Sequence, residues 1–120
     1  ANPGSVRAAI DTLADCSGRR TLVLGAMREL GPDSEKLHTE IGEYARAAGL
    51  DALVGVGAEV EAAPESFGAG ARQFATREEA AAALIQELTA DDVLLIKGSR
   101  SSGMELVLHA LSAQREAGEG

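Results

Sequence analysis

The chain alternates short, continuously apolar runs with longer segments in which apolar residues recur every three or four positions. The apolar runs are TLVLG at 21–25, ALVGV at 52–56, a weaker ARQFA at 71–75 and DVLLIK at 92–97. Continuous apolar runs of this length are typical of strands buried on both faces, as in a parallel sheet. We therefore predict four strands in a mostly parallel sheet.

The segments between the runs have the periodicity of helices. Within 5–14, Val6, Ala9, Ile10 and Leu13 fall on one face of a helix. A second helix is predicted to open at 32–35, with Leu37, Ile41, Tyr44, Ala45 and Ala48 as its apolar stripe. Gly49 is expected to end it as the residue after the C-cap.

Two further features predict helix boundaries. Thr76 and Glu79 have the spacing of a capping box, which predicts a helix from there to about Leu88. Pro64 interrupts 58–67 and predicts only a short or broken helix there. A last helix is predicted to begin near Ser102, followed by a fraying tail.

The alternation of strands and helices predicts an α/β fold, with a mostly parallel sheet and helices on both faces. A length of 120 residues suits a single domain, 1–120. The sequence opens with ANPGS directly into a helix, so we expect that a piece is missing upstream.

Composition excludes several classes of function. The net charge of −8, with only three aromatic residues, argues against a nucleic-acid surface. A single cysteine, Cys16, cannot form an internal disulfide and is expected to be buried or half-buried. No residues have metal-ligand spacing, and no apolar run nears the roughly 18 residues of a membrane span. We therefore expect a soluble protein of the cytoplasm.

Ligands of parallel sheets bind at the carboxyl ends of strands, which gives three candidate loops: 25–33, 57–63 and 97–102. The first is long for such a turn and holds Met27, Arg28 and Glu29 between two glycines. These residues either bind a ligand or are simply solvated while the glycines serve the turn. In the second, GVGAEV at 55–60 lacks the third glycine of a dinucleotide fingerprint, so its glycines are expected to serve the turn.

The third loop, KGSRSSG at 97–103, combines a predicted helix N-terminus with positive side chains. Helix N-termini favour anions, Lys97 adds a point charge, Ser99 a hydroxyl and Arg100 a fork that fits a carboxylate or phosphate. The spacing is not that of a Walker A loop. The alternative is a serine N-cap beside two solvated bases.

No nucleophile and base stand at motif spacing, so no catalytic residue is predicted. His38 and His109 both fall within predicted helices, where a solvated or packed imidazole is expected.

Several stretches together resemble the carboxy-terminal domain of the Mur ligase family. They are ANPGSVRAAIDTL, LGAMRELGPDSEKLHTEIGEYARAAGLD, VGVG, FGAGARQFA and LLIKGSRSSGME, in that order over nearly the whole chain. The resemblance implies a Rossmann-like three-layer domain. It also implies that the domains binding the UDP-sugar peptide and carrying the central ATPase, with its phosphate loop and metal ligands, lie outside this chain.

By this resemblance, the parent enzyme is an ATP- and Mg²⁺-dependent ligase of peptidoglycan synthesis. Its substrates are D-alanyl-D-alanine and UDP-N-acetylmuramoyl-tripeptide, and this domain positions the dipeptide and closes on the ATP site. The chain alone is expected to be inactive. A stand-alone anion- or nucleotide-binding module and a purely structural interaction domain remain alternatives.

The resemblance also implies roles for residues. Met27, Arg28 and Glu29 resemble the loop that faces the dipeptide and the ATP phosphates, although Ala26 stands where the family usually has Asp. A set of three resembles the site near the dipeptide carboxylate: Lys97, Ser99 and Arg100. Asn2 resembles a nucleotide-side contact.

Overall fold

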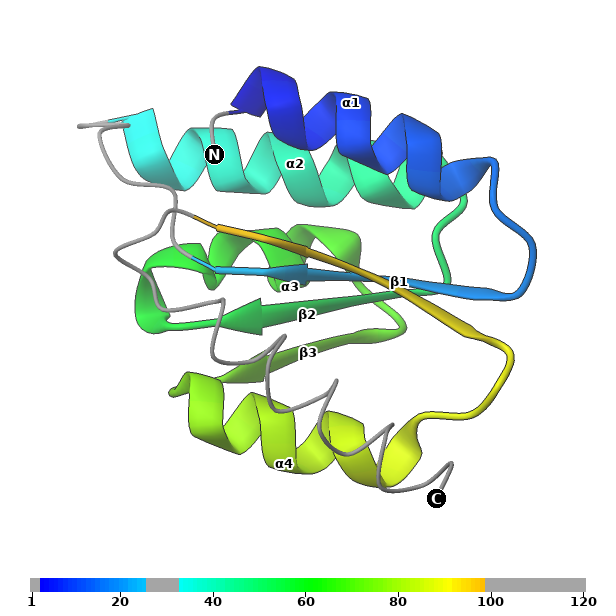
Figure 1. The fold of residues 1–120 in the computed structure, drawn as a ribbon. Helices are drawn as coiled ribbons and strands as arrows, with labels where there is room; N and C mark the ends of the chain where they lie inside the picture. The colour runs from blue at the N-terminus through cyan, green and yellow to red at the C-terminus, as the bar shows by residue number, and fades with distance from the viewer. Residues whose placement is uncertain (1–2, 26–32, 99–120) are drawn as a thin grey trace.

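The computed structural model describes residues 3–25 and 33–98. In chain order the elements are α1 (Pro3–Ala14), β1 (Arg19–Leu24), α2 (Ser34–Ala47), β2 (Ala52–Val56), the 3₁₀-helix η2 (Ala58–Val60), α3 (Ala62–Phe67), β3 (Ala71–Phe74), α4 (Arg77–Glu87) and β4 (Asp92–Lys97). All four predicted strands are present. They form one sheet in the order β3-β2-β1-β4, with every pairing parallel (Figure 1).

The central strand β1 begins two residues earlier than the apolar run predicts. Arg19 and Arg20 extend it because they continue the register with β4, where Arg19 pairs with Asp92. The Arg20 N–H also donates to Asp51 Oδ2 at 2.8 Å, just before β2. The polar start of this strand is therefore set by its neighbours rather than by its own hydrophobicity.

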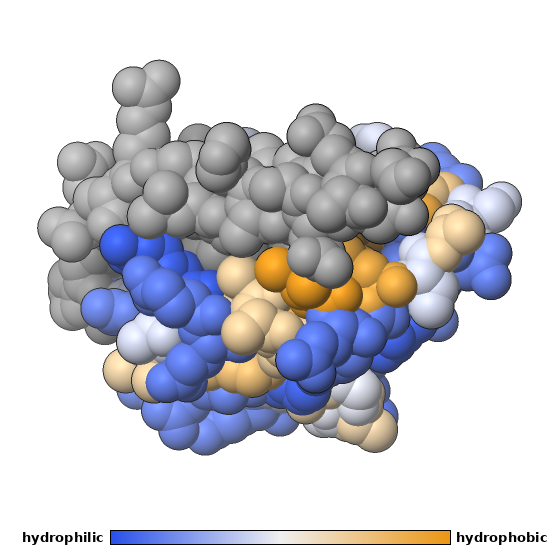
Figure 2. All heavy atoms as spheres, turned by 60° about the horizontal axis from the view of Figure 1, so that its bottom comes forward, coloured by the Kyte–Doolittle hydropathy of each residue, from blue (hydrophilic) through white to orange (hydrophobic). Residues whose placement is uncertain are grey.

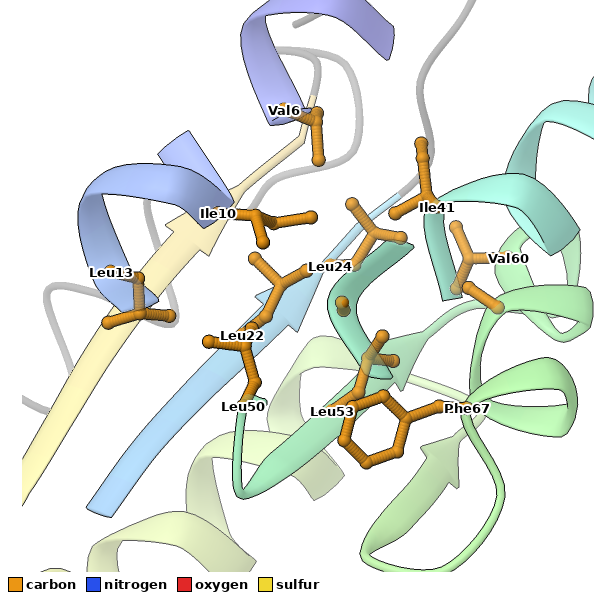
Figure 3. Packing of buried hydrophobic residues seen from close by; sticks show 12 residues of the cluster. Val6, Ile10, Leu13, Leu22, Leu24, Ile41, Leu50, Leu53, Val60 and Phe67 are labelled. Carbon is orange, nitrogen blue, oxygen red and sulfur yellow. The ribbon is translucent and has the colours of Figure 1, made fainter. Parts of the chain in front are cut away.

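Helices cover both faces of the sheet, as predicted (Figure 1). Leu22 and Leu24 of β1 point to the face covered by α1, α2 and α3, whereas Val23 points to the face covered by α4. The larger core lies on the first face, where Ile10, Ile41 and other fully buried aliphatic side chains meet (Figure 3). The sheet is thus buried on both sides, which explains the continuous apolar runs.

The α4 face has a thinner core. Val54, Val56, Ala80 and Leu84 are buried there, and partly exposed apolar side chains of β4 and α4 surround them. Figure 2 looks toward this side and shows hydrophobic residues gathered between hydrophilic ones.

The predicted helix ends are confirmed at two places. Thr76 Oγ1 accepts a hydrogen bond from the Glu79 N–H at 3.2 Å and caps α4. Gly49 has φ +86°, its N–H donates to the Arg46 carbonyl, and the Leu50 N–H donates to the Ala45 carbonyl. This pair of bonds is the Schellman motif that ends α2.

Two local expectations have opposite outcomes. The segment around Pro64 forms a short 3₁₀-helix and the six-residue α3, as the proline predicts. Cys16, in contrast, is exposed, so the expectation of burial is wrong. It lies after α1 ends, in the turn to β1, where the chain has left the apolar stripe.

Candidate functional site

The carboxyl ends of β1 and β4 lie side by side at one edge of the sheet. Leu24 pairs with Lys97 in the parallel register, and the Gly25 N–H donates to the Lys97 carbonyl oxygen at 2.8 Å. The two predicted binding segments, 25–29 and 97–100, therefore leave the sheet from adjacent strand ends. Met27, Arg28, Glu29, Ser99, Arg100 and Asn2 lie outside the described residues.

Lys97 is the predicted site residue that the structure does describe. It is half-buried as the last residue of β4. Because side chains alternate along a strand, Lys97 shares the face of Leu95, which packs with the α1–α3 core. Among the residues that the structure describes, its ammonium takes part in no ion pair.

The end of β2 adds a glycine turn to the same edge. Gly57 has φ +96°, donates its N–H to the Phe74 carbonyl at 2.9 Å and accepts from Gln73 Nε2 at 2.7 Å. Gly55 lies inside β2, where an added Cβ would meet Pro64 Cγ at 3.0 Å. Gly57 thus serves the turn, as predicted, whereas Gly55 lies within the strand and allows close packing.

His38 also lies near this edge, in the second turn of α2. Its side chain is fully buried, so the expectation of a solvated or packed imidazole is met by packing. Of the predicted apolar stripe of α2, Ile41 and Ala45 are buried, and Tyr44 and Ala48 pack partly buried against the core. His38 and Gly42, which the prediction left out of the stripe, are buried as well. The spacing of His38 from Ile41 and Ala45 carried that signal, which the polar character of histidine obscured.

Burial lowers the pKa of His38 below its usual 6.5. A hydrogen bond with the backbone of Ser34 and the negative charge of Glu59 act in the opposite direction. The Ser34 Oγ lies 3.3 Å from His38 Nδ1. Burial therefore favours the neutral form of this imidazole.

The described residues contain no cluster of side chains placed to bind a metal ion. Across 3–25 and 33–98, no group of three or more His, Cys, Asp or Glu is placed to hold a metal. We accordingly assign no ligand of Mg²⁺ to these residues. Within the same residues, no helix is long and apolar enough to cross a bilayer.

Comparison with known proteins identifies relatives over almost the whole chain. The chain is 42% identical over 113 residues to the UDP-N-acetylmuramoyl-tripeptide–D-alanyl-D-alanine ligase of Escherichia coli K12, a match of 92% of this chain and 25% of that protein. The ligase of the same name from Mycobacterium tuberculosis CDC 1551 is 33% identical over 98% of this chain. The chain spans about a quarter of the length of these relatives.

Solved structures give the same result for the fold. The MurF ligase of Thermotoga maritima, crystallised with ADP, superposes with a TM-score of 0.83 at 28% identity, covering 98% of this chain and 27% of that one. A MurF structure from Acinetobacter baumannii superposes with a TM-score of 0.81 at 34% identity, over 92% of this chain and 25% of that one. The family described as "Mur ligase, glutamate ligase domain" matches residues 1–100, and the chain belongs to the Mur ligase family.

Proposed function

We propose that this chain is the carboxy-terminal domain of a ligase that joins D-alanyl-D-alanine to UDP-N-acetylmuramoyl-tripeptide in peptidoglycan synthesis. The 42% identity with the Escherichia coli ligase of that name carries the proposal. The parallel sheet with a cationic strand end at its carboxyl edge supports it, because ligands of such sheets bind at that edge.

In this proposal the domain positions the dipeptide and supplies no catalytic residue. Lys97 attracts the dipeptide carboxylate, together with Ser99 and Arg100, whereas 27–29 face the dipeptide and ATP. Lys97 suits this role because its main chain is fixed by Gly25 while its ammonium is unpaired among the described residues. Holding the amine donor in one orientation accelerates amide formation without any chemistry by the domain itself.

ATP and Mg²⁺ belong to the parts of the ligase outside this chain, apart from a nucleotide-side contact at Asn2. ATP hydrolysis supplies the free energy of amide formation. The ADP in the Thermotoga maritima structure supports the use of ATP by the parent. A cytoplasmic location and a role in cell shape and division form part of the same proposal, since the nucleotide-linked substrate is cytoplasmic.

The test measures phosphate release by the full-length ligase with ATP, Mg²⁺ and the UDP-linked tripeptide, with and without D-alanyl-D-alanine. We expect phosphate release to depend on the dipeptide. We also expect the mass of the UDP-linked product to exceed that of the substrate by two alanine residues. L-alanyl-L-alanine serves as the control and should give no product. ATP turnover by this chain alone, or full-length turnover that ignores the dipeptide, would overturn the proposal.

A further inference from the structure

A buried imidazole lies on α2, close enough to η2 for the charge of Glu59 to act on it. His38 has no exposed surface, and neither does Val60 of η2. The two elements follow β1 and β2 respectively, so their contact joins the exits of two neighbouring strands. A change in the charge of His38 would therefore act close to the contact between the segments that follow β1 and β2.

The two ring nitrogens have different surroundings. Nδ1 faces Ser34, which offers both a hydroxyl and a backbone carbonyl one turn earlier in α2. Nε2 is buried and has no hydrogen-bond partner within the described part of the chain. The proton of the neutral ring therefore belongs on Nδ1, where Ser34 accepts it, and Nε2 carries the lone pair.

Protonation would change Nε2 from an acceptor into a charged N–H donor. A buried lone pair without a partner is tolerated at modest cost, but a buried charged donor without an acceptor is much more costly. The described residues at this interface offer no acceptor to Nε2. The geometry thus favours the neutral imidazole.

The charges around α2 do not replace the missing acceptor. On η2, Glu59 attracts a proton to the ring, but its side chain is exposed and forms no hydrogen bond with it. On α3 the titratable residue is Glu65, which is also exposed. From α1, Arg7 and Asp11 face α2, and they bind Glu40 and Tyr44 respectively.

We propose that His38 is a proton-sensitive joint: the neutral ring holds α2 against η2, and protonation loosens this contact at the carboxyl edge of the sheet. The joint lies on the sheet face that Lys97 shares. This inference concerns the chain itself and goes beyond the proposed ligase role, so either can fail without the other.

The direction of the pH effect follows from the lowered pKa of His38. Below pH 6.5 the unfolded chain takes up a proton at this side chain more readily than the folded chain. The contribution of the neutral His38 to the stability of the fold is therefore fully present above pH 6.5. It is lost as the pH falls through the pKa of His38 in the folded chain. Between pH 7.5 and 5.5 we therefore expect the Tm of this chain to fall.

The experiment compares the thermal melting of four chains between pH 7.5 and 5.5: wild type, His38→Gln, His109→Gln and Glu59→Gln. His38→Gln keeps an amide near the position of Nε2 but cannot titrate, so its Tm should change by less than about 1 °C between pH 7.5 and 5.5. His109→Gln is the matched control and should retain the fall. Glu59→Gln should deepen it, because the attraction that favours the charged ring is removed.

A second measurement needs no change at His38. In His109→Gln a single histidine remains, and its imidazole Cε1–H shift gives the pKa of His38 directly. We expect a midpoint below 6.5, shared by the Ser34 and Val60 amide shifts. A midpoint at or above 6.5, or a Tm fall in His38→Gln as large as that of the wild type, overturns the proposal. Should His38→Gln fail to fold, the titration alone decides.

Discussion

Gly42 of α2 lies directly against the Ala63 carbonyl group of α3. A Cβ built at position 42 would be 3.0 Å from the Ala63 carbonyl carbon and nearer still to its oxygen, and it would also meet the Ser66 hydroxyl. That hydroxyl donates to the Thr39 carbonyl at 2.8 Å, which ties the two helices together. The close approach of α2 and α3 therefore depends on the absence of a side chain at position 42.

Gly42→Ala should destabilise the chain by about 1–3 kcal/mol, despite the higher helix propensity of alanine. The physical reason is that main-chain atoms of α3, unlike a flexible side chain, cannot move away without separating the helices. Urea unfolding measures the change. Glu43→Ala, at the exposed neighbouring position, is the control and should stay within about 0.5 kcal/mol of wild type. Equal stability of both variants would show that α3 yields easily.

Arg20 joins the ends of α1 and α2 to the start of β1. Its guanidinium donates to the Ala14 carbonyl at 2.6 Å and to the Gly49 carbonyl at 2.5 Å. Its backbone N–H bond is the main cause of the lowered pKa of Asp51. Arg20→Lys should cost about 1–3 kcal/mol, because an ammonium cannot reach both carbonyls at once.

Arg19→Lys is the matched control for that substitution. The Arg19 side chain is 53% exposed, and its guanidinium lies 3.9 Å from Asp92. The expected change is within about 0.5 kcal/mol. If thermal melts show the same loss for both variants, then the two carbonyl bonds of Arg20 do not stabilise the fold.

Thr76→Ala should destabilise α4 by about 1 kcal/mol. The substitution removes the hydroxyl that accepts from the Glu79 N–H, and that donor then has only water as a partner. Thr76→Ser keeps the oxygen and should retain most of the stability. Amide hydrogen exchange in the first turn of α4 locates the effect, and unchanged protection in Thr76→Ala would contradict it.

Lys97→Ala in the full-length ligase should raise the KM for D-alanyl-D-alanine by roughly 10- to 150-fold, because a charge-assisted hydrogen bond to the carboxylate is lost. Arg100→Ala should act alike, and Arg100→Lys should also impair binding. Stability should change by only about 0.5 kcal/mol. Lys36→Ala, an exposed lysine on α2, is the control for KM. A large fall in Tm with an unchanged KM would make Lys97 structural.

Local signals in the sequence predicted much of the fold. Thr76 and Glu79 fixed the start of α4, and Gly49 fixed the end of α2, because each acts through bonds to residues a few positions away. The four apolar runs identified all four strands. These features could be predicted since the physics that creates them is contained in a short segment.

Other features depend on distant partners and could not be predicted in this way. The start of β1 at Arg19 comes from pairing with β4. The burial of His38 comes from the way α2 turns His38 and Gly42 toward the core beside the predicted Ile41 and Ala45. Of the candidate site, the adjacency of the Gly25 and Lys97 strand ends follows from the sheet order, whereas the proposed ligand contacts stay predictions.

The sheet order has a consequence for the folding kinetics of the chain. The central strand β1 pairs with β2, its successor, but also with β4, the last strand that the structure describes. During synthesis, β1, β2 and β3 can pair as soon as they leave the ribosome, but β1 keeps one edge unpaired until residues 92–97 have emerged. Closing that long loop carries most of the entropic cost of the topology and makes the docking of β4 a late step. Until then α1 can pack on α2 and β1 but lacks the part of its packing surface that β4 provides.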